Sequence, residues 1–131
     1  MSDEIDDQKR QLGKVTSVQF GIEDHGFLTL WLHLNFGGSG QGFGGVVLSN
    51  YDRDMKCPVG SAAGTDYVLR MFALFDVTSL DKIVGRYVYA LRDEPRGTIV
   101  GLEVPECDGG RKFIVAEWRR RMFPERNAEA S

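Results

Sequence analysis

The chain offers few residues of the kinds that carry out catalysis. Its two histidines, His25 and His33, are the only imidazole bases, and His25 lies beside Asp24 in a segment typical of a tight turn. No serine stands in a Gly-x-Ser-x-Gly nucleophile elbow, because the similar stretch at residues 38–40 precedes strand-like sequence rather than a helix. We therefore predict no catalytic residue, and a small hydrolase that uses His25 or His33 is only a third hypothesis.

The sequence does not indicate a metal site or a bound cofactor. Cys57 and Cys107 are far apart in the chain, and neither belongs to a Cys-x-x-Cys or Cys/His cluster of the kind that binds metal. A phosphate-binding P-loop is excluded, since no lysine occurs between Lys14 and Lys56. We expect no metal and no cofactor.

The most specialised stretch is FGGSGQGFGG at residues 36–45, which has six glycines in ten positions. Residues 40–45 match the dinucleotide pattern Gly-x-Gly-x-x-Gly, but that pattern needs a helix N-terminus directly after it to meet the pyrophosphate. Strand-like sequence follows here instead, at residues 46–48. The segment is therefore interpreted as a glycine-rich hairpin with bulges.

Glycines within a strand raise the question of what covers the bare backbone. Each costs roughly 0.5–1 kcal/mol relative to alanine, so some packing should offset the cost at Gly42, Gly44 and Gly45. The cover is either Trp31 or Trp118 of the same chain, or the surface of a partner. The sequence leaves these alternatives open.

Two groups of residues could form a binding site. Residues 27–36 alternate, with leucines on one face and a mixed aromatic and polar set on the other, which is either a ligand platform or a polar surface under a second layer. The arginine run at 119–121 could clamp phosphate or an acidic surface, or be a solvated helix face. The predicted binding residues are Trp31, His33, Asn35, Gln41, Gly42, Phe43, Gly44, Trp118, Arg119, Arg120 and Arg121.

Composition and charge exclude several classes of protein. The 131 residues are 42% hydrophobic, which is globular composition, and the formal net charge of -3 disfavours broad nucleic-acid binding. The N-terminal residues are acidic and lack the apolar run of a secretory signal, and no stretch approaches the roughly 20 apolar residues of a membrane span. We expect a cytoplasmic protein without membrane contact.

Hydrophobic periodicity predicts the elements. Strands are expected at 14–22, with Thr16, Val18, Phe20 and Ile22 on one face, and at 27–36 and 43–48. A loop at 49–64 precedes a main helix at 65–77 capped by Thr65, followed by a helical turn at 78–85 and a hairpin of strands 86–92 and 97–104.

The closing segment, 111–123, has an ambiguous pattern that we interpret as a strand running into a short helix. These elements predict an α+β fold with a mostly antiparallel sheet of five to six strands, in the order βββ-α-ββ-closing segment, packed on one main helix. We expect a single domain at 13–124, between an acidic flexible tail at 1–12 and a second flexible tail at 125–131.

The stretches EDHGFLTLWLHLNFGGSGQGFGG, VGRYVYALRD and AEWRRRMFP resemble a group of small bacteriophage and prophage proteins of unknown function. The resemblance implies a phage accessory protein that acts in the host cytoplasm. Our first hypothesis is a non-enzymatic protein that inhibits a host defence complex, and homo-oligomer formation stays open. The alternative is a binder that sequesters an anionic nucleotide, with backbone N–H groups near residues 38–44 and the arginines at 119–121 as donors.

Overall fold

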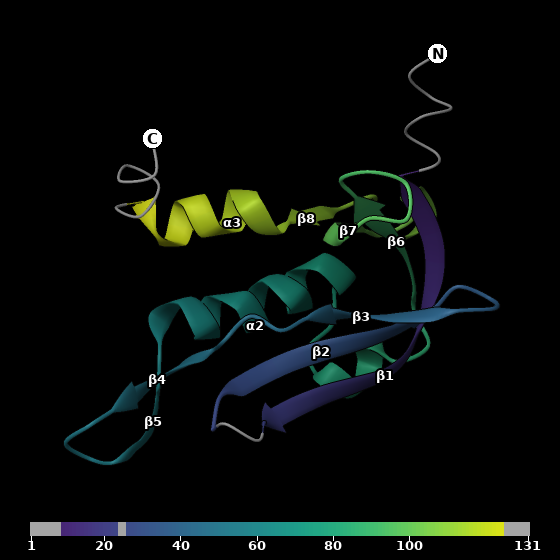
Figure 1. Cartoon of the computed structure of the whole chain (residues 1–131). Helices are drawn as coiled ribbons and strands as arrows, with labels where there is room; N and C mark the ends of the chain where they lie inside the picture. Colours follow the sequence, from purple (N-terminus) through teal and green to yellow (C-terminus); the bar gives the residue numbers. More distant parts are fainter. Residues whose placement is uncertain (1–8, 24–25, 125–131) are drawn as a thin grey trace. The chain divides into compact units, whose positions relative to one another are not determined.

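The computed structural model describes residues 9–23 and 26–124 and has an α+β fold (Figure 1). The predicted fold class is therefore confirmed. Its strands and helices are, in chain order, β1 (Arg10–Ile22), β2 (Leu28–Asn35), β3 (Gly40–Gly44), β4 (Ser49–Asp52), β5 (Cys57–Gly60), α2 (Ala62–Phe75), a 3-10 helix (Leu80–Ile83), β6 (Tyr87–Arg92), β7 (Ile99–Glu103), a 3-10 turn (Glu106–Asp108), β8 (Lys112–Ile114) and α3 (Val115–Met122).

Six strands form one antiparallel sheet in the order β3-β2-β1-β6-β7-β8, and β4 and β5 form a separate two-stranded sheet. The chain divides into two compact units: Gly13–Tyr87 forms one, and the described residues outside that range form the other. β1 begins at Arg10, so residues 10–12 of the expected tail are strand, whereas residues 1–8 and the expected tail at 125–131 lie outside the described residues.

The hairpin of β1 and β2 forms because both strands alternate and Gly26 adopts a positive φ of 81° in the turn between them. The leucines of β2 face the core, and Leu30, Leu32 and Leu34 are at most 2% exposed. Antiparallel pairing of the first two predicted strands and the buried leucine face are thus confirmed.

The predicted face of β1 holds for three of its four residues, which lie opposite leucines of β2, and is wrong for Thr16. A register shift between Val15 and Ser17 inserts Thr16 as an extra residue, so that the alternation restarts after it. Val15 is completely buried, but Phe20 and Ile22 are 49% and 65% exposed. The bulge separates a buried first half of the strand from an exposed second half.

Strand β3 spans Gly40–Gly44, which is earlier in the chain than the predicted residues 43–48. Phe36 N–H donates to the carbonyl of Ser39 at 2.8 Å and Gly37 has a φ of 107°, so that the turn ends at Ser39 and Gly40 already pairs with Asn35. Gly44 and Gly45 both have positive φ, which ends the strand before Val46. β3 is therefore built largely of the glycines themselves.

The expected loop at 49–64 contains the β4–β5 hairpin and the first turn of α2. Asp52 shapes the hairpin turn, since its carboxylate accepts bonds from the N–H groups of Asp54 and Met55. Ser61, not Thr65, caps the helix: its hydroxyl oxygen accepts from Gly64 N–H at 2.9 Å and donates to the carbonyl of Leu48 at 3.1 Å.

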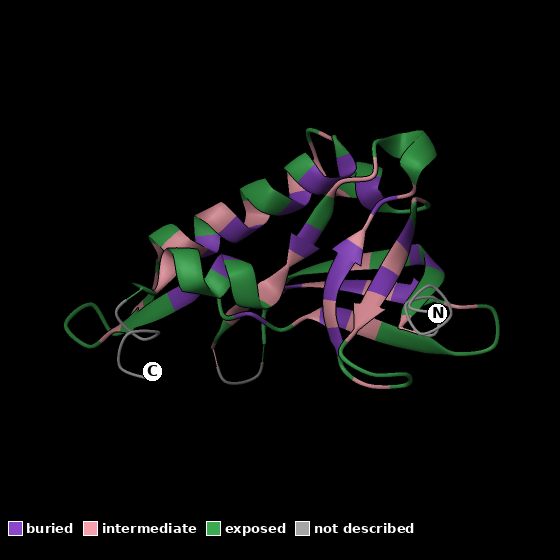
Figure 2. Cartoon of the chain, turned by 90° about the horizontal axis from the view of Figure 1, so that it is seen from above, coloured by how far each residue is buried: buried purple, intermediate pink, exposed green. Residues whose placement is uncertain are grey.

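α2 runs alongside β2 and β3 and buries one stripe of side chains (Figures 1 and 2). The stripe is centred on Tyr67, Met71, Leu74 and Phe75, while Val68 and Phe72 are only partly buried at its border. The first turn of α2 packs directly against the backbone of Leu48, because a Cβ on Gly64 would overlap that backbone.

In the second unit, β6 pairs with β7 and β7 pairs with β8, which confirms the predicted second hairpin. The closing segment is strand β8 followed directly by helix α3, so the interpretation of a strand running into a short helix is also confirmed. Within the described residues, no helix has the length and apolar character needed to cross a membrane.

Candidate functional site

The outward face of β2 carries three of the predicted binding residues. Trp31, His33 and Asn35 alternate with the buried leucines, so they share one side of the sheet, which we call the Trp31 face. Their partners on β3 are Gly44, Gly42 and Gly40 in that order. Since the three partners have no side chains, the edge strand contributes only backbone to the Trp31 face.

The indole of Trp31 covers this bare backbone. A Cβ built on Gly42 would lie 3.0 Å from Trp31 Cε3, and one built on Gly45 would lie 2.9 Å from Cζ2 and Cη2 of the same ring. The ring is held in place because Trp31 Nε1 donates a 2.8 Å hydrogen bond to Glu23 Oε1. The glycine backbone is therefore covered from within the chain, by Trp31.

Gly44 has a different reason to be glycine. Its φ is 140°, and a Cβ would overlap the carbonyl oxygen of Leu30 on the neighbouring strand. The requirement is therefore close approach of two backbones, not accommodation of a ring. Gly38 meets neither condition, because nothing lies within 4 Å of its Cβ position and its φ is not positive.

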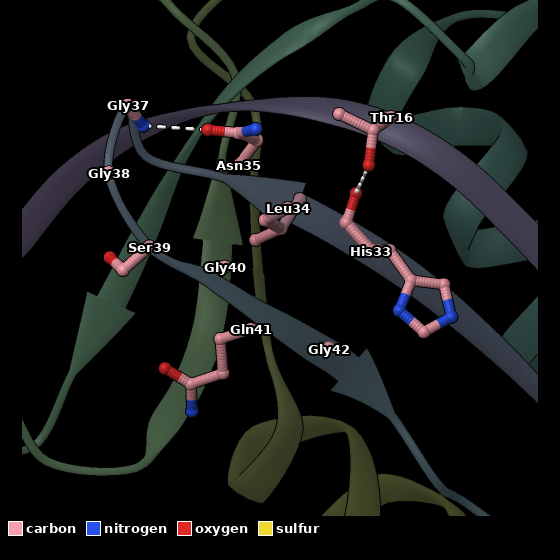
Figure 3. A pocket seen from close by; sticks show the side chains of 10 residues that line it. All are labelled: Thr16, His33, Leu34, Asn35, Gly37, Gly38, Ser39, Gly40, Gln41 and Gly42. Atoms are coloured by element: carbon pink, nitrogen blue, oxygen red, sulfur yellow. Dashed lines mark hydrogen bonds between the residues drawn. The ribbon is translucent and has the colours of Figure 1, made fainter.

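A depression of about 460 Å³ opens at the turn end of the Trp31 face (Figure 3). Asn35 Oδ1 accepts a 2.7 Å hydrogen bond from Gly37 N–H, which fixes the turn, and Thr16 Oγ1 donates to the backbone carbonyl of His33 at 3.2 Å. The residues that line it come from β1, β2, β3 and the turn: Thr16, His33, Leu34, Asn35, Gly37, Gly38, Ser39, Gly40, Gln41 and Gly42.

The depression is polar but lacks formal charge, because its lining contains no lysine, arginine, aspartate or glutamate. It offers an imidazole, two amides, two hydroxyls and exposed glycine backbone. Within the described residues, no carboxylate hydrogen-bonds the ring of His33, so the arrangement that activates a serine or threonine nucleophile is not assembled there. The geometry suits recognition through neutral hydrogen bonds.

Two of the predicted residues on β3 point to the other face. Gln41 and Phe43 pair with Leu34 and Leu32, so they belong to the core side of the sheet. Phe43 is 4% exposed and is a core residue, whereas Gln41 is exposed and lines the depression at its rim. His25 lies outside the described residues.

The predicted group at the C-terminal end belongs to the other compact unit. Trp118 is 4% exposed and packs between Phe113 and Phe123, with ring centroids 6.3 and 6.2 Å away. The three arginines at 119–121 are exposed in the last turn of α3, where positive charge stabilises the helix dipole. They thus have a structural role without any ligand.

Sequence reasoning missed Glu23 and Thr16. Glu23 anchors the indole across the hairpin, and the signal for it was its place next to the predicted turn, opposite the residues that precede Trp31. Thr16 enters the depression only because of the bulge in β1, which alternation alone does not reveal.

No protein-family model, curated protein sequence or solved structure matches this chain.

Proposed function

We propose that this chain is a non-enzymatic, phage-type accessory protein that binds a host protein through the Trp31 face and the depression beside it. The supporting observation is the combination of an aromatic ring on this face and the hydrogen-bonding side chains that line the depression. At Gly38 and Gly40, which Trp31 does not cover, a partner backbone or side chain can approach the backbone closely.

The character of the lining favours a protein partner over an anionic nucleotide. Nucleotide binders place positive charge or convergent N–H groups around the phosphates. The lining has no lysine or arginine, and the arginine run of α3 belongs to the other unit. The uncharged lining of the depression resembles the charge-depleted core of protein interfaces.

The test blocks the depression without disturbing the fold. Gly38→Arg adds a long side chain at a position where nothing lies within 4 Å and φ is not positive, and Gly60→Arg makes the same change under the same two conditions on β5. The partner is first captured from a bacterial host lysate by cross-linking to the wild-type chain and identified. Its dissociation constant is then measured for wild type and both variants.

We expect Gly38→Arg to weaken binding at least tenfold, and Gly60→Arg to bind like wild type, with all three melting temperatures similar. Equal binding by Gly38→Arg and wild type would disprove the proposed site. A large thermal shift with nucleotides, without a protein partner, would instead support the sequestering alternative, because a ligand that binds the folded state raises its apparent stability.

A further inference from the structure

The second half of β1 is an open sheet edge. On the side away from β2, the backbone of Val15 bonds to Arg86 and Gly85 at 2.9 and 2.8 Å. The chain before Gly85 turns into the 3-10 helix Leu80–Ile83, and within the described residues no strand pairs with 17–22 on this side. Residues 17–22 therefore have one strand neighbour instead of two.

Hydrogen-bond alternation shows which peptide groups point outward. Leu28 directs its carbonyl away from β1, because that oxygen accepts from Leu48 N–H at 2.8 Å. Ile22, which lies opposite Leu28, must then direct its own N–H and C=O away from β2. The same holds for Phe20 and Val18, since the direction repeats every two residues.

The side chains at this edge carry no charge, and those on the same face as the β2 leucines are apolar. Phe20 is 49% exposed and Ile22 is 65% exposed, next to a partly buried Val18 on the same face. Protein sheets normally protect an exposed edge with lysine, proline or an inward charge, and residues 15–22 contain no charged residue and no proline. Such an edge is suited to pairing with another strand.

The charges that flank the edge favour a second copy of this chain as the occupant. Lys14 precedes the uncharged stretch and Glu23 follows it, both exposed and on the side of the Trp31 face. Two copies that pair antiparallel bring the end of each strand that carries Lys14 toward the end of the other that carries Glu23, while a parallel arrangement would place like charges together.

We infer that the chain forms a two-fold homodimer by antiparallel pairing of residues 17–21 of β1 with the same residues of a second copy. Opposite residues place their side chains on the same face of the joined sheet only if their residue numbers are both odd or both even. The register centred on Gln19 satisfies this condition and pairs Val18 with Phe20 twice. It also ends the new pairing before Val15, whose outward peptide groups already bond to Arg86 and Gly85. The outward N–H and C=O groups of the two strands then hydrogen-bond to each other, and one sheet continues through both copies.

The first test measures mass in solution. Sedimentation equilibrium of the full chain should give twice its 14.7 kDa mass at micromolar concentration. Phe20→Lys should raise the dimer dissociation constant at least tenfold, because it puts like charges at the paired edge. Leu69→Lys is the matched control, since Leu69 is 48% exposed but lies on α2, and it should dimerise like wild type.

The second test fixes the register, in a background in which Cys57 and Cys107 are replaced by serine. In the proposed register Gln19 faces its own copy in a non-hydrogen-bonded pair, with Cα atoms about 4.5 Å apart, which a disulfide can bridge. Gln19→Cys should form a cross-linked dimer under mild oxidation. Ser17→Cys, on the same face but paired with Gly21, should cross-link at least tenfold more slowly.

A wild-type chain that is monomeric at 100 µM would overturn the proposal, as would equal weakening of the dimer by Phe20→Lys and Leu69→Lys. Faster cross-linking at Ser17 than at Gln19 would also overturn it, because the copies would then pair differently. The substituted residues of β1 do not line the depression, so the outcome can be distinguished from loss of binding there.

Discussion

Three glycines around β3 should respond to the same substitution in three different ways. An alanine Cβ at Gly44 would overlap the carbonyl oxygen of Leu30 at a φ of 140°, one at Gly42 would meet Trp31 Cε3 at 3.0 Å, and one at Gly38 would meet nothing within 4 Å. Each substitution adds one methyl group, so that the surroundings of the position determine the difference in stability.

The expected free energies follow from these surroundings. Strained backbone costs about 1–3 kcal/mol and an overpacked contact costs a similar amount, so Gly44→Ala should destabilise the protein by about 3 kcal/mol or more. Gly42→Ala should cost about 1 kcal/mol, because Trp31 must move by a few tenths of an ångström. Gly38→Ala should stabilise by about 0.4–1 kcal/mol through the unfolded chain.

Urea unfolding followed by far-ultraviolet circular dichroism measures all three variants against wild type, with the slope of the transition as a check on two-state behaviour. A double-mutant cycle isolates the contact with the ring: in a Trp31→Ala background, Gly42→Ala should lose its cost, while Gly44→Ala should keep it. A stability of Gly44→Ala within 0.5 kcal/mol of wild type, by the order of these estimates, would refute the reasoning.

Other variants probe single contacts. Ser61→Ala removes the cap of α2 and should cost about 1 kcal/mol in the same urea assay. Glu103→Gln removes the 3.5 Å ion pair with the exposed Arg10 and should cost no more than about 1 kcal/mol, less at high salt. The hydroxyl of Ser79 holds the pKa of Asp81 below its ordinary value of 3.8. The stability from this interaction is therefore present above pH 3.8 and is lost as the pH falls through the lowered pKa. Ser79→Ala should return the pKa of Asp81 toward 3.8 in a carboxyl NMR titration.

Alternation predicted the parts of the fold in which one face of a strand is buried and the other is not. The alternating leucines of β2 identified the face of that strand that points into the core. The turn at Gly26 then predicted that β2 pairs with β1. The strand β8 and helix α3 were predicted from a change of period within one segment. In each case the local pattern and the tertiary contacts agree.

The errors lie where a backbone contact overrides the local pattern. α2 starts at Ala62 because Ser61 binds the carbonyl of Leu48 and Gly64 fits against that residue, and neither contact is visible in the helix sequence alone. Thr16 was assigned to the wrong face of β1 because a bulge shifts the alternation there by one position. Both depend on a partner strand or a preceding turn, which single-strand periodicity does not describe.

The structure also changes which residues of the glycine segment bear on function. Trp31 explains Gly42 and Gly45, and the backbone of Leu30 explains Gly44, so that these three glycines are needed for folding. Their presence is therefore not evidence of a partner. The side chains of His33 and Asn35 also line the depression. Of their polar groups, Asn35 Oδ1 has a role in folding, because it accepts the hydrogen bond from Gly37 N–H in the turn. Substitutions that fill the depression or remove its hydrogen-bonding groups should therefore abolish partner binding while the stability is retained. The glycine-to-alanine substitutions should instead lower the stability, and should affect binding only through that loss.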